Sequence, residues 1–479
     1  MPDRSATRAA TTPGLVPDAF LQCVASGGDE RLQLNEISEN KYYVNPVQLD
    51  VFNRGSCTCS SATRDGFDAA IALFHQLSAG TIGFEEARLE QRNRLLRLHN
   101  ADAKQTEVIF APSGSDCCYF APYLSATVWP NKRIINVVTC PEELGSGSIL
   151  AHQAKYYSTI SQLASSLPAG DRISASLNVD YRPLAARSDR GDIIDHTETI
   201  ERIIEGAGSD TSVIVNLVIG SKSGIEDGLT VVEKFRGSGV IWTVDLCQLR
   251  TSPALVRKLI DLDCILFITG SKFFQAAPFC GALFVPRKYI DYLASVRSPT
   301  TLGFEALFSR HDFPSELTRI RPQFSPLENR GLLLRWEMAL REIELFAEIP
   351  LATSLSTIKQ WNGQVMEALS ENRRFERLSD QERTNESIVS FRIRNRSGQN
   401  LNHGQLAEVH RRIATTRHPL LDTYAKTLIG QPVAYGSGSF IRLAIGAHDV
   451  RRFAREGCDF TDDQRLIETM DQISGTVSH

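Results

Sequence analysis

Short apolar runs alternate with amphipathic stretches between about residues 105 and 290. The runs are apolar on both faces, which is typical of strands in a parallel sheet covered by helices on both sides. The predicted strands are residues 107–110, 133–139, 213–217, 240–246, 264–269 and 282–285. Segments between them, such as residues 116–128, have helical character. This alternation predicts a doubly wound α/β domain with its ligand site at the carboxyl ends of the strands.

The flanking regions have different patterns. One helical face is predicted ahead of the sheet, and a long amphipathic helix follows it near residues 333–347. The last third mixes predicted strands (388–393 and 439–445) with predicted helices (405–413 and 464–473), as in an α+β lobe. We therefore expect an N-terminal arm with a substrate-entrance segment (1–60), a large domain (61–305) and a small C-terminal α+β domain (306–479).

Composition excludes several classes of protein. The 479 residues are 42% hydrophobic and 23% charged, as in ordinary globular proteins, and the net charge of -4 gives no reason to expect nucleic acid or an anionic membrane as partner. Residues 1–14 lack the apolar core of a signal peptide and indicate an irregular lead, so a cytoplasmic location is expected. The ten cysteines include only two close pairs, Cys57/Cys59 and Cys117/Cys118, neither with metal-binding spacing.

The strongest chemical signal lies in two segments that follow predicted strands. VDLCQ places Asp245 at the end of one strand, and TGSK places Lys272 after another, 27 positions later. Both side chains can therefore reach the same edge of a parallel sheet. An amine can bind pyridoxal 5′-phosphate (PLP) covalently, and a carboxylate can keep its pyridine nitrogen protonated. A nucleotide site is disfavoured: GSGSILA (145–151) has Leu150 where a dinucleotide fingerprint needs its third glycine, and no P-loop sequence is present.

These segments resemble the fold-type I PLP enzymes, and most closely the class V aminotransferase and cysteine desulfurase branch. There, D-x-x-Q precedes S-x-H-K by a similar distance. The resemblance implies that Lys272 holds the cofactor, Asp245 binds the pyridine nitrogen, and Gln248 contacts the phenolic oxygen. Thr269 and Ser271 fall where a serine and a histidine contact the phosphate. It also implies an aspartate aminotransferase-like fold, with a large mostly parallel-sheet domain and a smaller α+β domain.

Three further elements fit the resemblance. Gly114, Ser115 and Asp116 form a small-residue turn that opens a helix and resembles the family's phosphate-binding turn. Ser221 stands where the family has an asparagine near the cofactor oxygen. Arg442, on a predicted strand of the small domain, matches the arginine that grips the substrate carboxylate.

Two departures concern Glu143 and cysteine chemistry. Glu143 occupies the position where desulfurases place a histidine over the cofactor ring, so either it lies near the ring or the alignment slips there. Desulfurases also need a nucleophilic cysteine between the lysine and the carboxylate-binding arginine. Only Cys280 lies in that interval, close to the strand, which argues against sulfur transfer.

Two other segments could contribute to a substrate or cofactor site. Residues 53–66 read best as a surface loop, although Arg54 or Arg64 could help to bind substrate. Thr300 and Thr301 lie where the family reaches into a partner's phosphate site. The resemblance implies a homodimer with its active site at the interface.

The predicted function is that of a PLP-dependent enzyme acting on an amino acid, or on a substrate with an amino-acid moiety, through an external aldimine and a quinonoid. Lys272 would be the base that removes the α-proton. Transferase chemistry of the aminotransferase type ranks first. A lyase, a β- or γ-replacement enzyme or a carbon–carbon bond-forming enzyme of specialised metabolism stays open, as does a noncatalytic sensor or scaffold.

Overall fold

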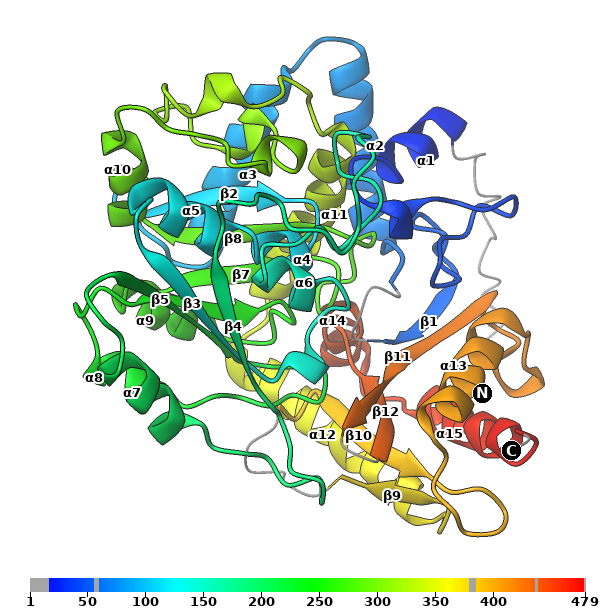
Figure 1. Cartoon of the computed structure of the whole chain (residues 1–479). Helices are drawn as coiled ribbons and strands as arrows, with labels where there is room; N and C mark the ends of the chain where they lie inside the picture. The colour runs from blue at the N-terminus through cyan, green and yellow to red at the C-terminus, as the bar shows by residue number, and fades with distance from the viewer. Residues whose placement is uncertain (1–16, 56–59, 379–384, 436–437, 478–479) are drawn as a thin grey trace.

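Two sheets organise the computed structural model, which describes residues 17–55, 60–378, 385–435 and 438–477 (Figure 1). The irregular lead and the Cys57/Cys59 pair lie outside these ranges. In the described residues the larger sheet has seven strands in the order β2-β8-β7-β6-β5-β3-β4, and β8 is antiparallel to both of its neighbours. Its strands are β2 (Thr106–Ala111), β3 (Arg133–Thr139), β4 (Val179–Leu184), β5 (Thr211–Val218), β6 (Ile241–Leu246), β7 (Ile265–Thr269) and β8 (Gly281–Pro286).

Burial on both faces explains why the apolar runs form this sheet. All residues of β2 and β5 are buried. Along β5, Val213 and Val215 contribute to one core, while Ile214 between them contributes to the core on the other face. All six predicted strands are present. Strand β4 is not among the predicted strands, because this edge strand is only half-buried and carries Pro183, so it lacks the apolar pattern.

Helices cover both faces of the larger sheet, as the doubly wound pattern predicts. The predicted helix at 116–128 is two helices, α4 and α5. The helices that precede or belong to this region are α1 (Asp18–Val24), α2 (Arg64–Ser78), α3 (Phe84–Leu98), α4 (Gly114–Cys117), α5 (Phe120–Val128), α6 (Ser148–His152), α7 (Thr197–Glu205), α8 (Thr230–Lys234), α9 (Pro253–Asp261), α10 (Arg287–Ser295) and α11 (Arg330–Ala347). No helix in the described ranges has the length and apolar character that crossing a membrane requires.

The smaller sheet has the order β1-β11-β12-β10-β9. Its strands are β1 (Val51–Arg54), β9 (Phe375–Arg377), β10 (Ile388–Ile393), β11 (Lys426–Tyr435) and β12 (Gly438–Ala444). Its helices are α12 (Leu351–Ser370), α13 (His403–Thr415), α14 (Ala447–Glu456) and α15 (Thr461–Ser474). These helices and strands share one apolar core.

Packing places two segments differently from the expected domain limits. Strand β1, expected in an N-terminal arm, pairs in parallel with β11 of the smaller sheet. Helix α11, expected in the small domain, buries Leu332, Trp336 and Leu340 in the core of the larger sheet. The packing therefore favours a boundary near residue 350, after α11.

Candidate active site

Asp245 and Lys272 meet at one edge of the larger sheet. Asp245 lies at the end of β6, and Lys272 follows the neighbouring strand β7; both line a small inner cavity of about 50 Å³. The Asp245 carboxylate accepts a hydrogen bond of 2.7 Å from the backbone N–H of Cys247, which fixes its orientation. In the described chain the Lys272 amine makes no hydrogen bond or ion pair with a protein group. The structure thus brings together the two residues on which the sequence hypothesis depends.

The loop after β2 forms another wall of the inner cavity, through Ser113, Gly114 and Ser115. Ser113 caps α4, and its hydroxyl donates to a carboxylate oxygen of Asp116 at 2.6 Å. Asp116 does not line the cavity. Burial, assisted by the charge of Asp29, raises the pKa of Asp116 to about 6. Two of the three predicted turn residues therefore reach the cavity, while Asp116 supports the turn from behind.

Two glycines of the cavity wall pack closely against neighbouring side chains. A Cβ atom on Gly114 would lie 2.6 Å from Sγ of Cys247, and one on Gly145 would lie 2.9 Å from Oγ of Ser115. Both distances are too short for a Cβ atom unless the Cys247 or Ser115 side chain moves. Glycine therefore lets the backbone at these two positions approach the side chains of the cavity wall closely.

Thr269 and Ser271 line the same cavity, as does Ser148 at the start of α6. The Thr269 hydroxyl donates to the carbonyl of Cys247 at 2.7 Å and so ties the ends of β6 and β7 together. Ser115 and Ser148 have their hydroxyl oxygens 3.2 Å apart. A cluster of small hydroxyl side chains and backbone amides is a suitable environment for a phosphate group.

An outer cavity of about 410 Å³ lies next to the inner one, and the two share Arg31, Gly145 and Lys272 as lining residues. Gln248 lines the outer cavity, and its predicted contact with the phenolic oxygen of the cofactor stays a prediction. Lys41, Tyr42 and Tyr43 reach it from the N-terminal segment, and His403 and His410 reach it from α13 of the small domain. The candidate site therefore lies between the two sheets.

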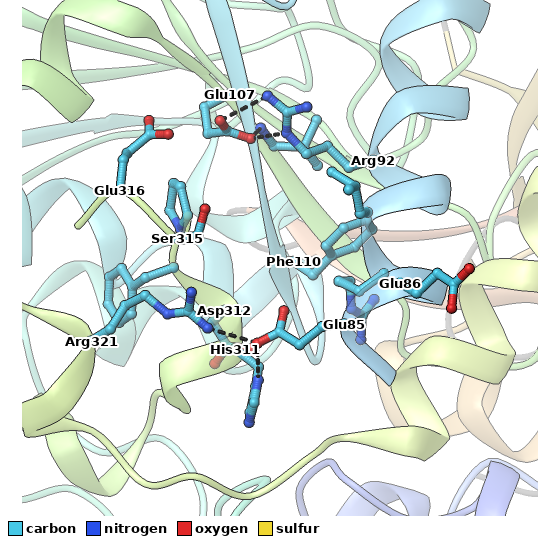
Figure 2. Close-up of a pocket in the computed structure, with 15 residues that line it drawn as sticks. Glu85, Glu86, Arg92, Glu107, Phe110, His311, Asp312, Ser315, Glu316 and Arg321 are labelled. Atoms are coloured by element: carbon cyan, nitrogen blue, oxygen red, sulfur yellow. Dashed lines mark hydrogen bonds and ion pairs between the residues drawn. The ribbon is translucent and has the colours of Figure 1, made fainter. Parts of the chain in front are cut away.

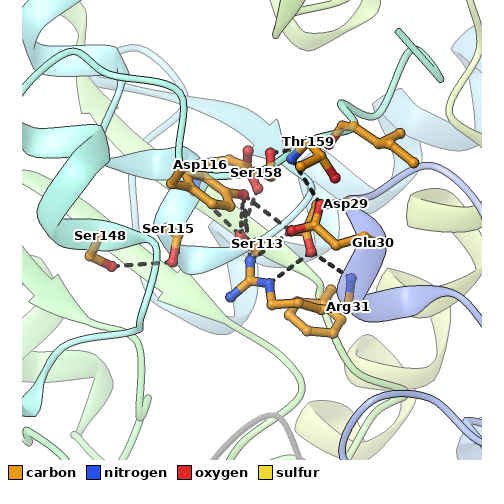
Figure 3. A network of polar contacts seen from close by, with 12 residues as sticks. Asp29, Glu30, Arg31, Ser113, Ser115, Asp116, Ser148, Ser158 and Thr159 are labelled. Carbon is orange, nitrogen blue, oxygen red and sulfur yellow. Dashed lines mark hydrogen bonds and ion pairs between the residues drawn. The ribbon is translucent and has the colours of Figure 1, made fainter. Parts of the chain in front are cut away.

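Arg31 is a residue that the sequence analysis missed. It is 6% exposed and lines both cavities, and Figure 3 shows it beside Asp29 and close to Ser113. Its Nε and Nη2 donate to the two oxygens of Asp29 at 2.7 and 2.6 Å. Its guanidinium also lies over the rings of Phe279 and Tyr157, at 4.7 and 5.2 Å from their centres. No local pattern around Arg31 could reveal these contacts, because its ring partners are more than 120 positions away.

The structure does not bring Glu143 or Ser221 to either cavity. Glu143 is buried and accepts hydrogen bonds from the Ser221 hydroxyl, from the Ser223 backbone N–H at 2.8 Å and from the Ser223 hydroxyl. It also pairs with Arg187 at 3.4 Å. Gly145 and Ser146, two and three positions later, line the outer cavity instead. Of the two alternatives for Glu143, the geometry therefore favours a local slip of the alignment, and the Glu143 carboxylate is paired with Arg187 from another loop.

Arg442 is fully buried on β12, directly behind the wall of the outer cavity. Its Nη1 donates to the carbonyl of Gln431, which lines that cavity. Arg250 lies close to Arg442. Burial is the main cause that lowers the pKa of Arg250 to about 9, and the positive charge of Arg442 adds to it. The predicted role of Arg442 in carboxylate binding stays a prediction.

Arg54 does not belong to the site. It is fully buried and binds Asp463 through Nε and Asp449 through Nη1, each at 2.6 Å. The sequence interpretation of residues 53–66 as a surface loop is therefore wrong at Arg54, which joins β1 to α14 and α15.

A third cavity, of about 550 Å³, is larger than either of these two but lacks their chemistry (Figure 2). It lies between α3, β2 and residues 311–321, and its charged side chains largely neutralise one another. Arg92 pairs with Glu107, and Glu85 binds both His311 and Arg321 at 2.7 Å. It contains none of the predicted site residues, so the smaller pair of cavities around Lys272 is the candidate active site.

Comparisons with known proteins agree with this geometry at the level of the fold. No protein-family model matches the sequence, and no curated protein matches it. Among solved structures, the NifS-like protein of Rickettsia africae matches with a TM-score of 0.55 at 12% identity, over 89% of this chain and 99% of that one. The alanine–glyoxylate aminotransferase of Nostoc sp. matches with a TM-score of 0.55 at 14% identity, over 90% and 97%.

A cysteine desulfurase of Thermococcus onnurineus also matches, with a TM-score of 0.55 at 15% identity, over 88% of this chain and 94% of that one. The chain therefore has the PLP-dependent transferase fold that class V aminotransferases and cysteine desulfurases share, and the predicted fold class is confirmed.

Proposed function

We propose that this protein is a PLP-dependent enzyme that acts on an amino-acid substrate, with transferase chemistry of the aminotransferase type. The observation that carries the proposal is the convergence of Lys272 and Asp245 on one cavity, at the ends of neighbouring strands. A noncatalytic sensor or scaffold of this fold would need neither a lysine amine nor an oriented carboxylate in this cavity.

The cavity residues fit the cofactor. The Ser113–Ser115 turn, Ser148 and Ser271 would hold the phosphate, and Arg31 would neutralise its charge. Arg31 would supply a positive charge at the phosphate, because Ser271 stands where the family has a histidine that contacts the phosphate. Gly114 and Gly145 also line the inner cavity, where they would bring their backbone close to the bound group.

Once bound, PLP supplies an aldehyde that an amine can bind covalently and a ring that accepts electrons. Lys272 would hold the cofactor and then move the proton at the α-carbon of the substrate. Asp245 would keep a proton on the ring nitrogen, and the hydrogen bond from the Cys247 backbone N–H to its carboxylate supports this role. Arg442, with Arg250 beside it, would hold the substrate carboxylate.

Sulfur transfer is disfavoured, although desulfurases share the fold. Cys280 is fully buried, and burial raises its pKa to about 12, so its thiolate is not available as a nucleophile. A lyase or replacement reaction would use the same residues, and the reaction products separate these cases.

We also propose a homodimer, as in the family that the sequence resembles.

The test is cofactor loading followed by exposure to amino acids. Purified protein mixed with PLP should develop a visible absorption band, and the Lys272→Ala variant should not. An amino acid that converts the band to that of pyridoxamine phosphate, with release of a keto acid, supports transamination. Exchange of the α-proton without the keto acid supports lyase or replacement chemistry. Full activity in the Lys272→Ala variant would contradict the proposal.

A further inference from the structure

Two carboxylates share one guanidinium beside the predicted phosphate turn (Figure 3). Asp29 accepts hydrogen bonds from Arg31 through both of its oxygens, at 2.7 and 2.6 Å. Asp116 forms no ion pair with any residue in the described ranges, although the charges of Asp29 and Arg31 both act on it. The neighbouring Tyr119 and Tyr157 hydroxyls are neutral, because burial raises the pKa of each well above its ordinary value. An ionised Asp116 therefore leaves this network with one excess negative charge.

The hydrogen bond between Ser113 and Asp116 has a direction that depends on this charge. An ionised carboxylate only accepts, so the Ser113 hydroxyl donates its single hydrogen to Asp116, at 2.6 Å. The backbone N–H of Asp116 donates to the same hydroxyl oxygen at 3.3 Å. Ser113 lines the inner cavity, yet in this arrangement it has no hydrogen left for a bound phosphate. A protonated Asp116 would donate to Ser113 instead, and the Ser113 hydrogen would be free to point into the cavity.

A phosphate in the inner cavity favours the protonated form of Asp116 for two reasons. A dianionic phosphate only accepts hydrogen bonds, so it gains the Ser113 hydrogen only when Asp116 supplies another to Ser113. It also brings about two negative charges close to a carboxylate that already has Asp29 as a neighbour. The adjacent Cys117 and Cys118 thiols stay neutral, because burial raises the pKa of each well above its ordinary value.

We propose that binding of the cofactor phosphate takes up one proton from solvent, at Asp116, and reverses the hydrogen bond between Asp116 and Ser113. Asp116 is then a positioning residue, because it does not line the inner cavity and acts through the Ser113 hydroxyl. This inference rests on the proposed function and adds a proton to its cofactor-binding step. Burial raises the pKa of Asp116 to about 6, so at neutral pH the ionised carboxyl can take up a proton at small cost.

The pH dependence of cofactor affinity tests the inference on the apoprotein. From about pH 6.5 to about pH 8, the affinity of the unmodified protein for PLP, relative to that of Asp116→Asn, should fall roughly 5- to 25-fold, as uptake of one proton requires. Near pH 5.5 the two proteins should bind PLP almost equally, since the asparagine amide donates to Ser113 as the protonated carboxyl does. Pyridoxal, which lacks the phosphate, should show no such divergence. Asp68→Asn, at an exposed position of α2 that lines neither cavity, should behave like the unmodified protein.

A direct count of protons separates the alternatives. In weakly buffered solution near pH 7, a pH indicator should report that the unmodified protein takes up roughly 0.5 to 1 proton more per bound PLP than Asp116→Asn does. Equal uptake by the two proteins would place the proton on the phosphate itself and overturn the inference. A difference in PLP affinity that does not change with pH would mean that Asp116 only shapes the turn, and would overturn it as well. Either result leaves the proposed function standing, whereas an unmodified protein that fails to load PLP overturns the proposed function itself.

Discussion

Arg31 gives the sharpest test of how the cofactor phosphate would be held. Removing its guanidinium removes a charge-assisted contact, which is worth about 1.5–3 kcal/mol and corresponds to a roughly 10- to 150-fold weaker affinity for PLP. A single Arg31→Gln substitution is ambiguous, however. It leaves the Asp29 carboxylate buried with Tyr157 as its remaining side-chain partner, which destabilises the local fold.

The pair Asp29 and Arg31 offers a cleaner design. Although burial alone would raise the pKa of Asp29, its contacts with Arg31 and Tyr157 hold that pKa below its ordinary value, so the carboxylate is charged. The Asp29→Asn variant keeps the guanidinium and should bind PLP at least as tightly as the unmodified protein. The Asp29→Asn/Arg31→Gln double variant keeps an amide pair of similar shape. It should show the whole loss of affinity for PLP, roughly 10- to 150-fold, that removal of the guanidinium predicts.

Titration of the apoprotein with PLP and with pyridoxal, which lacks the phosphate, isolates the effect. The double variant should lose affinity for PLP while its affinity for pyridoxal stays close to that of Asp29→Asn. Equal losses for both compounds would mean that Arg31 has only a structural role. An unchanged affinity for PLP would refute the assignment of Arg31 to the phosphate.

Three other predictions each concern one ionisable side chain. Arg54→Leu leaves Asp449 and Asp463 buried without their partner and should cost about 3–5 kcal/mol in urea unfolding; a loss of substrate binding at unchanged stability would contradict the structural role. The folded-state pKa of Asp116 is raised to about 6, so ionisation of this carboxyl lowers the stability of the protein as pH rises from about 4 to about 6. The Asp116→Asn variant cannot ionise there, and its free energy of unfolding should exceed that of the unmodified protein by up to about 3 kcal/mol at the upper end of this window. Equal pH profiles of the two proteins in chemical unfolding would contradict the raised pKa. Asp245→Asn should still load PLP on Lys272 but lose roughly 100-fold or more in turnover, and an unchanged rate would exclude its role at the ring nitrogen.

The sequence predicted the parts of the site that are local in the chain. Strand periodicity locates the ends of β6 and β7, and it therefore predicts that Asp245 and Lys272 share one edge of the sheet. The turn after β2 was recognised for the same reason, because its small residues immediately follow a strand.

Long-range contacts explain what the sequence could not reveal. Arg31 belongs to the site only because the N-terminal segment folds back over Phe279 and Tyr157. The position of Glu143 could not be decided from the sequence because its partners, Ser221, Ser223 and Arg187, lie 44 to 80 positions away. The small residues at 145–148 lack the third glycine of a nucleotide fingerprint, but their spacing suits a backbone that approaches a bound group closely.

Chemical trapping at Lys272 tests the central claim most directly. Protein incubated with PLP, reduced with borohydride, digested and analysed by mass spectrometry should carry the reduced cofactor on the peptide that contains Lys272 and on no other lysine in stoichiometric amount. Modification at another lysine, or no modification, would contradict the account.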